Sequence, residues 1–183
     1  MFDIRKLQEN VIYKSVKAEN NEDIANEVVY GREGSANAEN DADWVKSTMH
    51  RLEGRFKPEA IKRIRMGCQC GYGMDEKLAL VKELKLTAAD IEEFANSEKA
   101  KAAGLFCKDG KLFLQFHFCP CPMLLKVEKL ETNTWCQCTT GYSKVLFEKA
   151  FNCNVDVELL KSIKMGDDVC LMKIILHNPV WEE

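Results

Sequence analysis

The spacing of apolar residues changes from a helical to an extended period near Gly104, and this change limits the fold. Before it, apolar residues recur three to five positions apart, as from Trp44 through Met49 to Leu52. After it, every second residue from Leu112 to Phe118 is apolar, and the residues between them include Gln115 and His117. The sequence therefore predicts an α+β fold with a helical N-terminal half and a sheet in the C-terminal half.

The alternating half contains four predicted strands, at residues 112–118, 123–130, 155–159 and 169–176. A helix is predicted between the second and third strands, with Tyr142, Leu146 and Ala150 on its apolar face. The β-β-α-β-β order, with a hairpin at each end, favours an antiparallel sheet that helices cover on one side.

The helical half is predicted to carry four helices. One contains Trp44 and Leu52, a second begins at Pro58, and a third carries Val81. Thr87-Ala-Ala-Asp90 is typical of a capping box that opens the fourth. Residues 1–40 are polar and are predicted to be an extension and linker, with one short amphipathic segment. Residues 41–183 are predicted to form one domain, helical over 41–104 and sheet-bearing over 105–183.

Charge and hydropathy exclude several classes of partner. The net charge of −3 gives no electrostatic reason to expect nucleic acid or an anionic membrane surface. The basic stretch Lys62-Arg63-Ile64-Arg65 is interpreted as a solvated helix face. The N-terminus has no apolar run typical of a signal peptide, and no segment approaches membrane-spanning length. We therefore expect a cytoplasmic protein, in which thiols stay reduced.

Six of the nine cysteines stand in Cys-X-Cys pairs. These pairs are Cys68/Cys70, Cys119/Cys121 and Cys136/Cys138. In an extended segment, side chains two apart project from the same face at roughly 6–7 Å along the strand. Two such sulfurs can share a soft metal ion or close a strained, reducible ring. Because an odd cysteine count in a cytosolic chain argues against a disulfide scaffold, metal binding and thiol chemistry are favoured.

Each cysteine also has a simpler interpretation as a small buried apolar side chain. This is the better account of Cys107 and Cys153, which stand alone. Cys68 and Cys70 precede a predicted helix, whose positive end lowers a thiol pKa, whereas the acidic residues of its first turn raise it. The sequence leaves open whether either thiol is reactive.

His117 lies two residues before Cys119 in the alternating segment. The two side chains would then share a face, so His117 is a candidate for a Cys/His nucleophilic pair or for a ligand nitrogen. The alternative is a histidine that only faces solvent.

Three segments of the second half resemble the 4-vinyl reductase-like domains, a superfamily of small-molecule-binding domains. They are Trp135-Cys-Gln-Cys-Thr-Thr-Gly-Tyr142, the predicted strand at 155–163, and Met165-Gly-Asp-Asp-Val-Cys170. The resemblance covers roughly residues 106–180. The chain is also similar to an uncharacterised bacterial cysteine-rich group with a Cys-x-Cys-Pro motif and a Cys-x-Cys-Ser-x-Gly-Trp motif. Here Thr and Tyr replace the Ser and Trp of the second motif.

The resemblance implies a zinc site. Sensor members of the superfamily hold zinc with a cysteine, a glutamate and two later cysteines, which correspond here to Cys136, Glu158 and Cys170. The position of the superfamily's remaining cysteine ligand corresponds to a place near Lys161 in this chain, and a protonated lysine cannot bind zinc. Either another thiol, from Cys138, Cys119 or Cys121, takes the fourth position, or the site is absent.

Two functions follow as hypotheses. The first is a binding module, in which sheet and helices enclose a small-molecule pocket and zinc is held by ligands from Cys119, Cys121, Cys136, Cys138, Glu158 and Cys170. The second is a thiol-dependent enzyme. It would be a hydrolase similar to those of 2-aminothiazoline-4-carboxylate, or a thiol–disulfide redox protein acting through Cys68/Cys70 or Cys119/Cys121. The resemblance also implies a homodimer formed through the helices.

Overall fold

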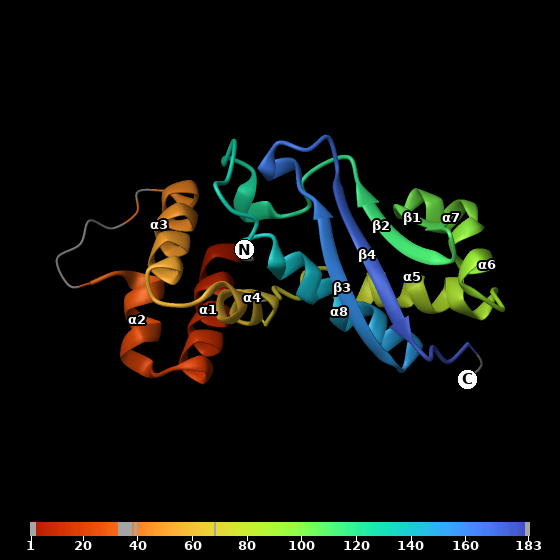
Figure 1. The fold of residues 1–183 in the computed structure, drawn as a ribbon, viewed down its shortest axis with the longest axis horizontal. Helices are drawn as coiled ribbons and strands as arrows, with labels where there is room; N and C mark the ends of the chain where they lie inside the picture. The colour runs from red at the N-terminus through yellow and green to blue at the C-terminus, as the bar shows by residue number, and fades with distance from the viewer. Residues whose placement is uncertain (1–2, 33–37, 39, 68, 182–183) are drawn as a thin grey trace. The chain divides into compact units, whose positions relative to one another are not determined.

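The computed structural model describes residues 3–32, 38, 40–67 and 69–181. Its described part is an α+β fold, as predicted (Figure 1). The chain divides into two compact units. Unit 1 comprises residues 1–70, 119–141 and 164–166, and unit 2 comprises residues 71–118, 142–163 and 167–183.

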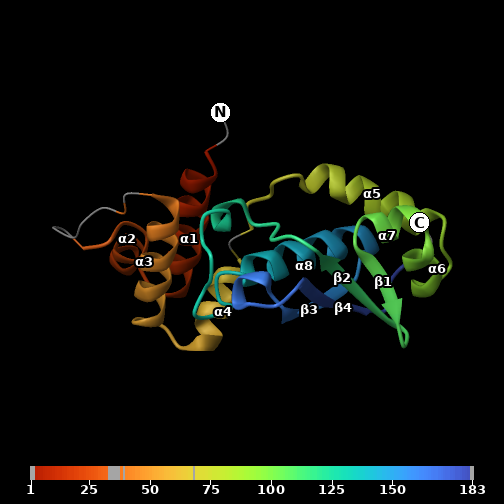
Figure 2. The same cartoon turned by 90° about the horizontal axis from the view of Figure 1, so that it is seen from above.

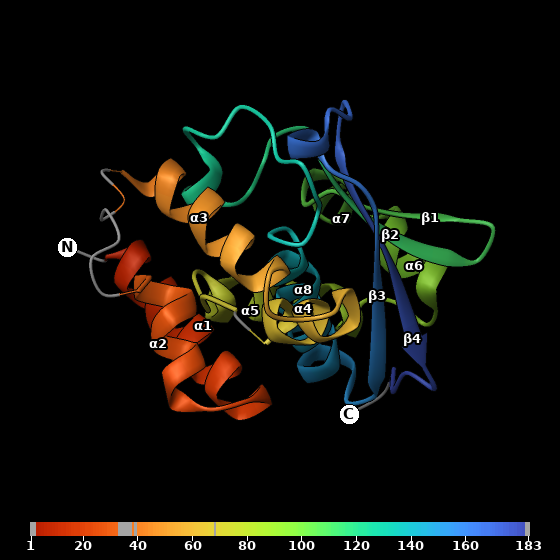
Figure 3. The same ribbon diagram turned by 60° about the vertical axis from the view of Figure 1, so that its left-hand side comes forward.

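Unit 1 is built from helices α1 (Ile4–Glu19), α2 (Glu22–Tyr30), α3 (Asp41–Glu53) and α4 (Pro58–Met66), together with the short 3-10 helix η1 (Pro122–Leu124). Figure 3 shows the four α-helices of this unit most openly. Helix α1 packs against α2 and α4, and η1 packs against α3. The helix starts follow the sequence closely. Asn21 and Asn40 accept hydrogen bonds from backbone N–H groups in the first turns of α2 and α3, and Pro58 occupies the first turn of α4.

Unit 2 contains α5 (Met74–Leu86), α6 (Ile91–Asn96), α7 (Glu98–Ala102) and a four-stranded sheet. The strands are β1 (Leu105–Lys108), β2 (Lys111–Phe116), β3 (Asn154–Lys161) and β4 (Cys170–His177), in the order β1-β2-β4-β3, with every pair antiparallel. Helix α8 (Gln137–Phe151) begins in unit 1 and continues into unit 2, and η2 (Ile163–Met165) lies between β3 and β4. Helices lie on one face of this sheet (Figure 2).

The core of unit 2 is mainly apolar, and the polar residues buried in this unit are Lys85, Ser143 and Ser162. Alternate residues of the strands, including Leu112, Leu114, Met172 and Ile174, are buried against the helices. Phe151 of α8 is fully buried, with its ring centroid 5.2 Å from that of Phe94 and 5.1 Å from that of Trp181. The period-2 pattern of the strands therefore identifies the buried face correctly.

The first hairpin lies earlier in the chain than predicted. The β-β-α-β-β order is confirmed, but the first two strands are β1 and β2 rather than 112–118 and 123–130. Asp109 and Gly110 form the turn, both with positive φ, as in a two-residue type I′ hairpin. The predicted strand at 123–130 is wrong, because the segment is η1 followed by irregular chain. Its buried residues, Met123, Leu124, Val127 and Leu130, are mostly three positions apart and do not alternate.

Two further details differ from the sequence analysis. Helix α2 was not predicted, although Ala25, Val28 and Val29 bury one of its faces. The cap of α6 is Asp90, whose carboxylate accepts from the backbone N–H groups of Glu92 and Glu93, and Thr87 instead ends α5. Part of the predicted linker, residues 33–37 and 39, lies outside the described residues. Among the described helices, none is long and apolar enough to cross a bilayer.

Candidate functional site

The Cys119-Pro120-Cys121 pair lies in unit 1, directly before η1. Cys121 has extended backbone angles, with φ −85° and ψ 114°, which is the geometry assumed for the pair. Both thiols are half-buried. A negative charge on Cys119 would raise the pKa of Cys121, so the two sulfurs lie within electrostatic range of each other.

The Cys136-Gln137-Cys138 pair adopts a different geometry. Cys136 is buried in a turn and Cys138 lies in the first turn of α8, so the extended spacing assumed for this pair is wrong. Helical residues two apart do not face each other. The Gln8 side chain of α1 donates a hydrogen bond to Cys138 Sγ at 3.9 Å, and Gln8 is itself buried.

Gly141 of the same motif brings α8 close to the end of α4. A Cβ atom at this position would lie 1.9 Å from the backbone oxygen of Met66. Glycine inside a helix costs about 1 kcal/mol relative to alanine, and a packing requirement explains its presence here. The motif glycine thus fixes the first turn of α8 within unit 1.

Arg65 of α4 is fully buried, so the interpretation of its basic stretch as a solvated helix face is wrong at this residue. Its Nη2 donates to the backbone oxygen of Trp135 at 3.1 Å, and its guanidinium lies 4.0 Å from the centroid of the Trp135 ring. Its Nε and Nη1 are buried without a hydrogen-bond acceptor among the described residues. No described carboxylate forms an ion pair with it. A buried cation in such surroundings needs a compensating negative charge.

Trp135 connects Arg65 to the cysteines. The indole is nearly fully buried, and its ring meets Trp44 edge-on at 5.7 Å between centroids. The indole Nε1 has no acceptor with full hydrogen-bond geometry among the described atoms, yet it faces the Cys121 sulfur closely enough to favour the thiolate. We refer to Arg65, Cys121 and Trp135 as the thiol–guanidinium cluster.

Two opposing influences act on the Cys121 thiol. Burial is the largest, and it raises the pKa of Cys121 above its usual range. The Trp135 indole N–H, the Met123 backbone N–H and the charge of Arg65 oppose that rise. Burial outweighs these influences, so the pKa of Cys121 lies above its ordinary value.

The predicted residues in unit 2 do not gather at one point. Glu158 of β3 is exposed and lies opposite Lys173 of β4, whose Nζ is 3.3 Å from its carboxylate. Cys170 shares the buried face of β4 with Met172, so it lies on the opposite face of the sheet from Glu158. The ligand set implied by the resemblance therefore does not fit this sheet. His117 follows β2, is exposed, and has its Nε2 3.0 Å from the Gln115 side-chain nitrogen.

The remaining cysteines are dispersed. Cys70 is half-buried in unit 1, and Cys68 lies outside the described residues. Cys107 and Cys153 are half-buried in unit 2, and burial is the main cause that raises the pKa of each thiol. Over residues 3–32, 38, 40–67 and 69–181, no three His, Cys, Asp or Glu side chains lie close enough to hold one metal ion. Zinc binding therefore stays a prediction.

Unit 2 also contains a pocket of about 550 Å3 between the sheet and its helices. The sequence predicts a small-molecule pocket in this half of the chain but does not identify its lining residues. The lining is mostly apolar, with cationic side chains and no carboxylate among the described lining residues. It comprises Lys77, Leu80, Val81, Lys101, Ala102, Ala103, Gly104, Leu105, Phe106, Leu114, Gln115, Phe116, His117, Phe118, Leu146 and Phe147. We refer to it as the sheet–helix pocket.

The fold and these sites define an α+β protein with a cysteine-rich helical unit and a pocket-bearing sheet unit. The chain belongs to a family of unknown function (DUF6144), whose model matches residues 1–181. Comparison with curated proteins gave no match, and comparison with solved structures gave none. The resemblance to 4-vinyl reductase-like domains stays a prediction.

Proposed function

We propose that the protein is a small-molecule-binding module whose ligand occupies the sheet–helix pocket of unit 2. The observation that carries the proposal is the pocket itself. Its volume of about 550 Å3 lies within the range of roughly 300–1,000 Å3 that is usual for small-molecule sites. An apolar lining with few polar groups is also usual for such sites.

The lining favours an apolar body. Leu80 and Val81 come from α5, Leu146 and Phe147 from α8, and Leu114 from β2. Side chains of three elements thus surround the same space, and burial of apolar ligand surface against them would supply the main part of the binding free energy.

The charges at the pocket favour an anionic end group. Lys77 and Lys101 contribute positive charge to the lining, and the described lining residues include no Asp or Glu. Lys77 Nζ lies 4.7 Å from the Tyr142 ring centroid, which restricts its position, and Lys101 pairs with Glu98 at 3.7 Å on an exposed surface. The ligand class that fits is a carboxylic acid with an aliphatic or aromatic body.

Titration calorimetry on the full chain tests this proposal with decanoate and naphthalene-1-carboxylate. Each acid is compared with its alcohol of the same carbon skeleton. We expect at least one acid to bind and to bind about tenfold more tightly than its alcohol, since tenfold corresponds to about 1.4 kcal/mol. Binding of neither acid, or equal binding of acid and alcohol, would contradict the proposal.

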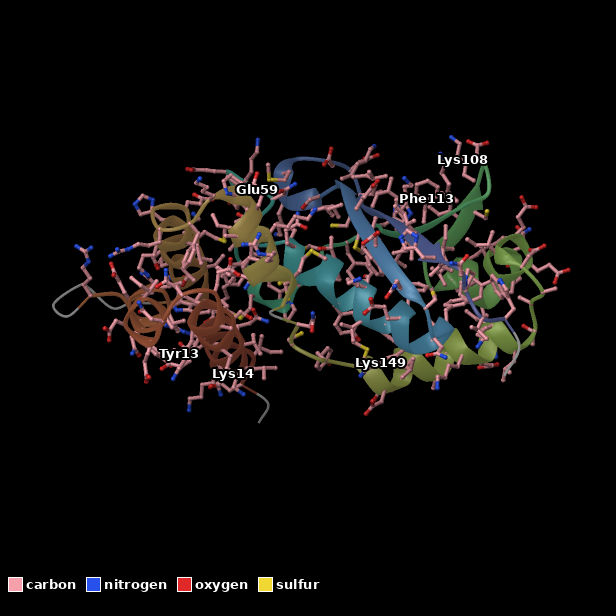
Figure 4. The ribbon with its side chains drawn as sticks, turned by 60° about the horizontal axis from the view of Figure 1, so that its bottom comes forward. Tyr13, Lys14, Glu59, Lys108, Phe113 and Lys149 are labelled. Carbon is pink, nitrogen blue, oxygen red and sulfur yellow. The ribbon has the colours of Figure 1, made fainter. Side chains whose placement is uncertain are left out.

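Three variants locate the binding site. Ala102→Trp adds bulk at an exposed lining position, and Lys101→Glu reverses a lining charge, so both are expected to weaken acid binding about tenfold or more. Lys108→Glu is the matched control, because Lys108 is exposed at the end of β1 and outside the lining (Figure 4). Equal losses of acid affinity in Lys101→Glu and Lys108→Glu would show that the affinity does not depend on the pocket.

A further inference from the structure

We propose that unit 1 binds a zwitterionic amino acid with an apolar side chain, in a cavity between α1, α2 and α3. The cavity has a volume of about 280 Å3, and almost all of its described lining residues come from these three helices. The described lining residues all belong to unit 1, so the proposal does not depend on the pocket of unit 2 or on the ligand proposed there. We refer to this cavity as the three-helix cavity.

Arg51 of α3 contributes a positive charge to the lining of the three-helix cavity. Its Nε donates to the backbone oxygen of Val28 at 2.7 Å. Its Nη2 donates to the backbone oxygen of Val29 at 3.3 Å and to the Thr48 hydroxyl at 3.2 Å. These acceptors are neutral, and no described carboxylate forms an ion pair with Arg51. The guanidinium is half-buried, and burial lowers the pKa of Arg51 more than the charge of Glu27 raises it. A carboxylate on a ligand would therefore supply the missing negative charge.

Asp43, in the first turn of α3, contributes a negative charge to the same lining. Its Oδ2 accepts a hydrogen bond from the Asn40 side-chain nitrogen at 2.7 Å. In the part of the chain that the structure describes, no lysine or arginine forms an ion pair with Asp43. Glu9, the second carboxylate among the described lining residues, differs because it pairs with Arg5 at 3.1 Å. Asp43 is thus the lining carboxylate that can bind an ammonium group of a ligand.

The positions of these two charges favour one ligand that carries both an ammonium group and a carboxylate. Arg51 Nη2 and the Trp44 indole Nε1 donate to the same oxygen, that of Val29, at 3.3 Å and 3.0 Å. The Arg51 head group therefore reaches back along α3 toward Asp43, although residues eight positions apart are separated by about 12 Å along a helix axis. An α-amino acid with hydrogen bonds of about 2.8 Å at each end can bridge charges up to about 8 Å apart. The lining also contains two arginines and two carboxylates, and this balance favours a zwitterion over a simple anion or cation.

The apolar part of the lining favours a ligand with an apolar side chain. Val29 and Trp44 are buried, whereas Tyr30, at the end of α2, is 56% exposed. An apolar side chain of a ligand would cover part of the Tyr30 ring and remove it from water, which contributes to the binding free energy. The volume of about 280 Å3 lies just below the range of roughly 300–1,000 Å3 that is usual for small-molecule sites. A ligand as small as a single amino acid matches this volume.

Titration calorimetry on the full chain at pH 7 tests the proposal with L-leucine and L-phenylalanine. Each amino acid is compared with the amine that lacks its carboxylate, 3-methylbutylamine or 2-phenylethylamine, and with the acid that lacks its ammonium group, 4-methylpentanoate or 3-phenylpropanoate. Decanoate is present throughout, so that the function proposed for unit 2 and this proposal are tested separately. We expect at least one amino acid to bind about tenfold or more tightly than its amine and its acid, because each of these loses hydrogen bonds between charged groups.

Two variants locate the amino-acid site. Asp43→Asn removes the carboxylate charge at an exposed residue and keeps an oxygen that accepts from Asn40, and Ser47→Phe adds bulk at a half-buried lining position. Each variant is expected to weaken amino-acid binding about tenfold or more. Asp23→Asn is the matched control, because Asp23 is an exposed carboxylate in the first turn of α2 and lies outside the lining. Its amino-acid affinity is expected to equal that of the wild type.

Arg51→Gln tests the cation separately. In this variant the affinity for the amino acid is expected to fall to that for its amine, whereas the affinity for the amine is expected to stay the same. Should Arg51→Gln fail to fold, Asp43→Asn provides the corresponding test, with the amino-acid affinity falling to that for the acid. Three results would overturn the proposal: binding of neither amino acid, an amine or acid that binds as tightly as its amino acid, or equal amino-acid affinities in Asp43→Asn and Asp23→Asn.

Discussion

Unit 1 and unit 2 differ in what they bury. The core cluster of unit 2 is formed by leucine, valine, isoleucine, methionine, alanine and phenylalanine side chains from four strands and several helices. Unit 1 also buries apolar residues, but among them lie Arg65, Gln8, Thr48, Gln137 and Thr140. Unit 2 buries the polar residues Lys85, Ser143 and Ser162, but among its described residues no buried side-chain polar atom lacks a hydrogen-bond partner. All the unsatisfied buried donors named above belong to unit 1. A buried polar group without a hydrogen-bond partner lowers the stability of the fold, and such groups are expected at functional sites. The difference therefore makes unit 1 a candidate for a functional site.

Unit 2, by contrast, contains the sheet–helix pocket. An apolar core that is open on one side offers shape and hydrophobic burial, whereas the thiol–guanidinium cluster offers charge and sulfur.

The largest expected effect is a loss of stability on truncating the core of unit 2. Phe151→Ala should lower the free energy of unfolding by about 4 kcal/mol, because large-to-small changes of buried aromatic residues typically cost 3–5 kcal/mol. Phe151 is fully buried against Phe94 and Trp181. Urea denaturation followed by circular dichroism measures the change. Leu86→Ala, at a residue 67% exposed in the same unit, is the control and should change stability by less than about 0.5 kcal/mol. Similar losses in the two variants would contradict the apolar core described for unit 2.

In unit 1, the sign of the stability change caused by Gly141→Ala tests how closely α8 packs against α4. Alanine inside a helix is normally favoured over glycine by about 1 kcal/mol. At Gly141, however, the added Cβ would overlap the Met66 backbone oxygen, and overpacking of this kind costs about 1–3 kcal/mol. We therefore expect Gly141→Ala to destabilise the protein by about 2 kcal/mol in urea denaturation.

The control for this variant is another glycine of unit 1. At Gly54 an added Cβ would come no nearer than 3.4 Å to the His50 oxygen, so Gly54→Ala should be close to neutral. If Gly141→Ala instead raised the stability, the close approach of α8 and α4 would be wrong, and with it the position of Trp135 relative to Arg65.

The sequence predicts the fold well where local periodicity decides the structure. The strands β3 and β4 and the helices α3 and α4 lie where alternation, helical spacing and Pro58 placed them. The first hairpin differs from the prediction because its first strand, Leu105–Lys108, is short. The sequence does contain a signal for its turn, since Asp109-Gly110 is a dipeptide typical of a type I′ hairpin.

The site was predictable only in part. The cysteine pairs are visible in the sequence, but their geometry depends on the backbone around them, which is extended at Cys121 and helical at Cys138. Helical spacing places Arg65 on the buried face of α4, because it follows Ile61 by four positions, whereas its charge predicted exposure. Its partner in that buried position is Trp135, 70 positions later in the chain. The identity of such a partner depends on tertiary packing, and no local pattern contains it.

The smallest expected effect concerns an exposed ion pair on the surface of unit 1. Unlike Arg65, the arginines of this pair have a carboxylate partner. Glu27 of α2 accepts hydrogen bonds from Arg55 and from Arg32, and the first of these is the main cause that lowers the pKa of Glu27. A carboxyl group whose pKa is lower in the folded state adds stability above its unfolded pKa, and that stability is lost as the pH falls through the folded value. Glu27→Gln should therefore melt slightly below the wild type at pH 7. The difference should shrink as the pH falls below the ordinary glutamate pKa of about 4.3, and it should vanish below the lowered folded pKa of Glu27. Thermal melts at pH 7 and pH 3, each at low and high salt, measure this, because salt screens exposed charge pairs. A difference that is as large at pH 3 as at pH 7 would mean that Glu27 acts through packing and that its charge is immaterial.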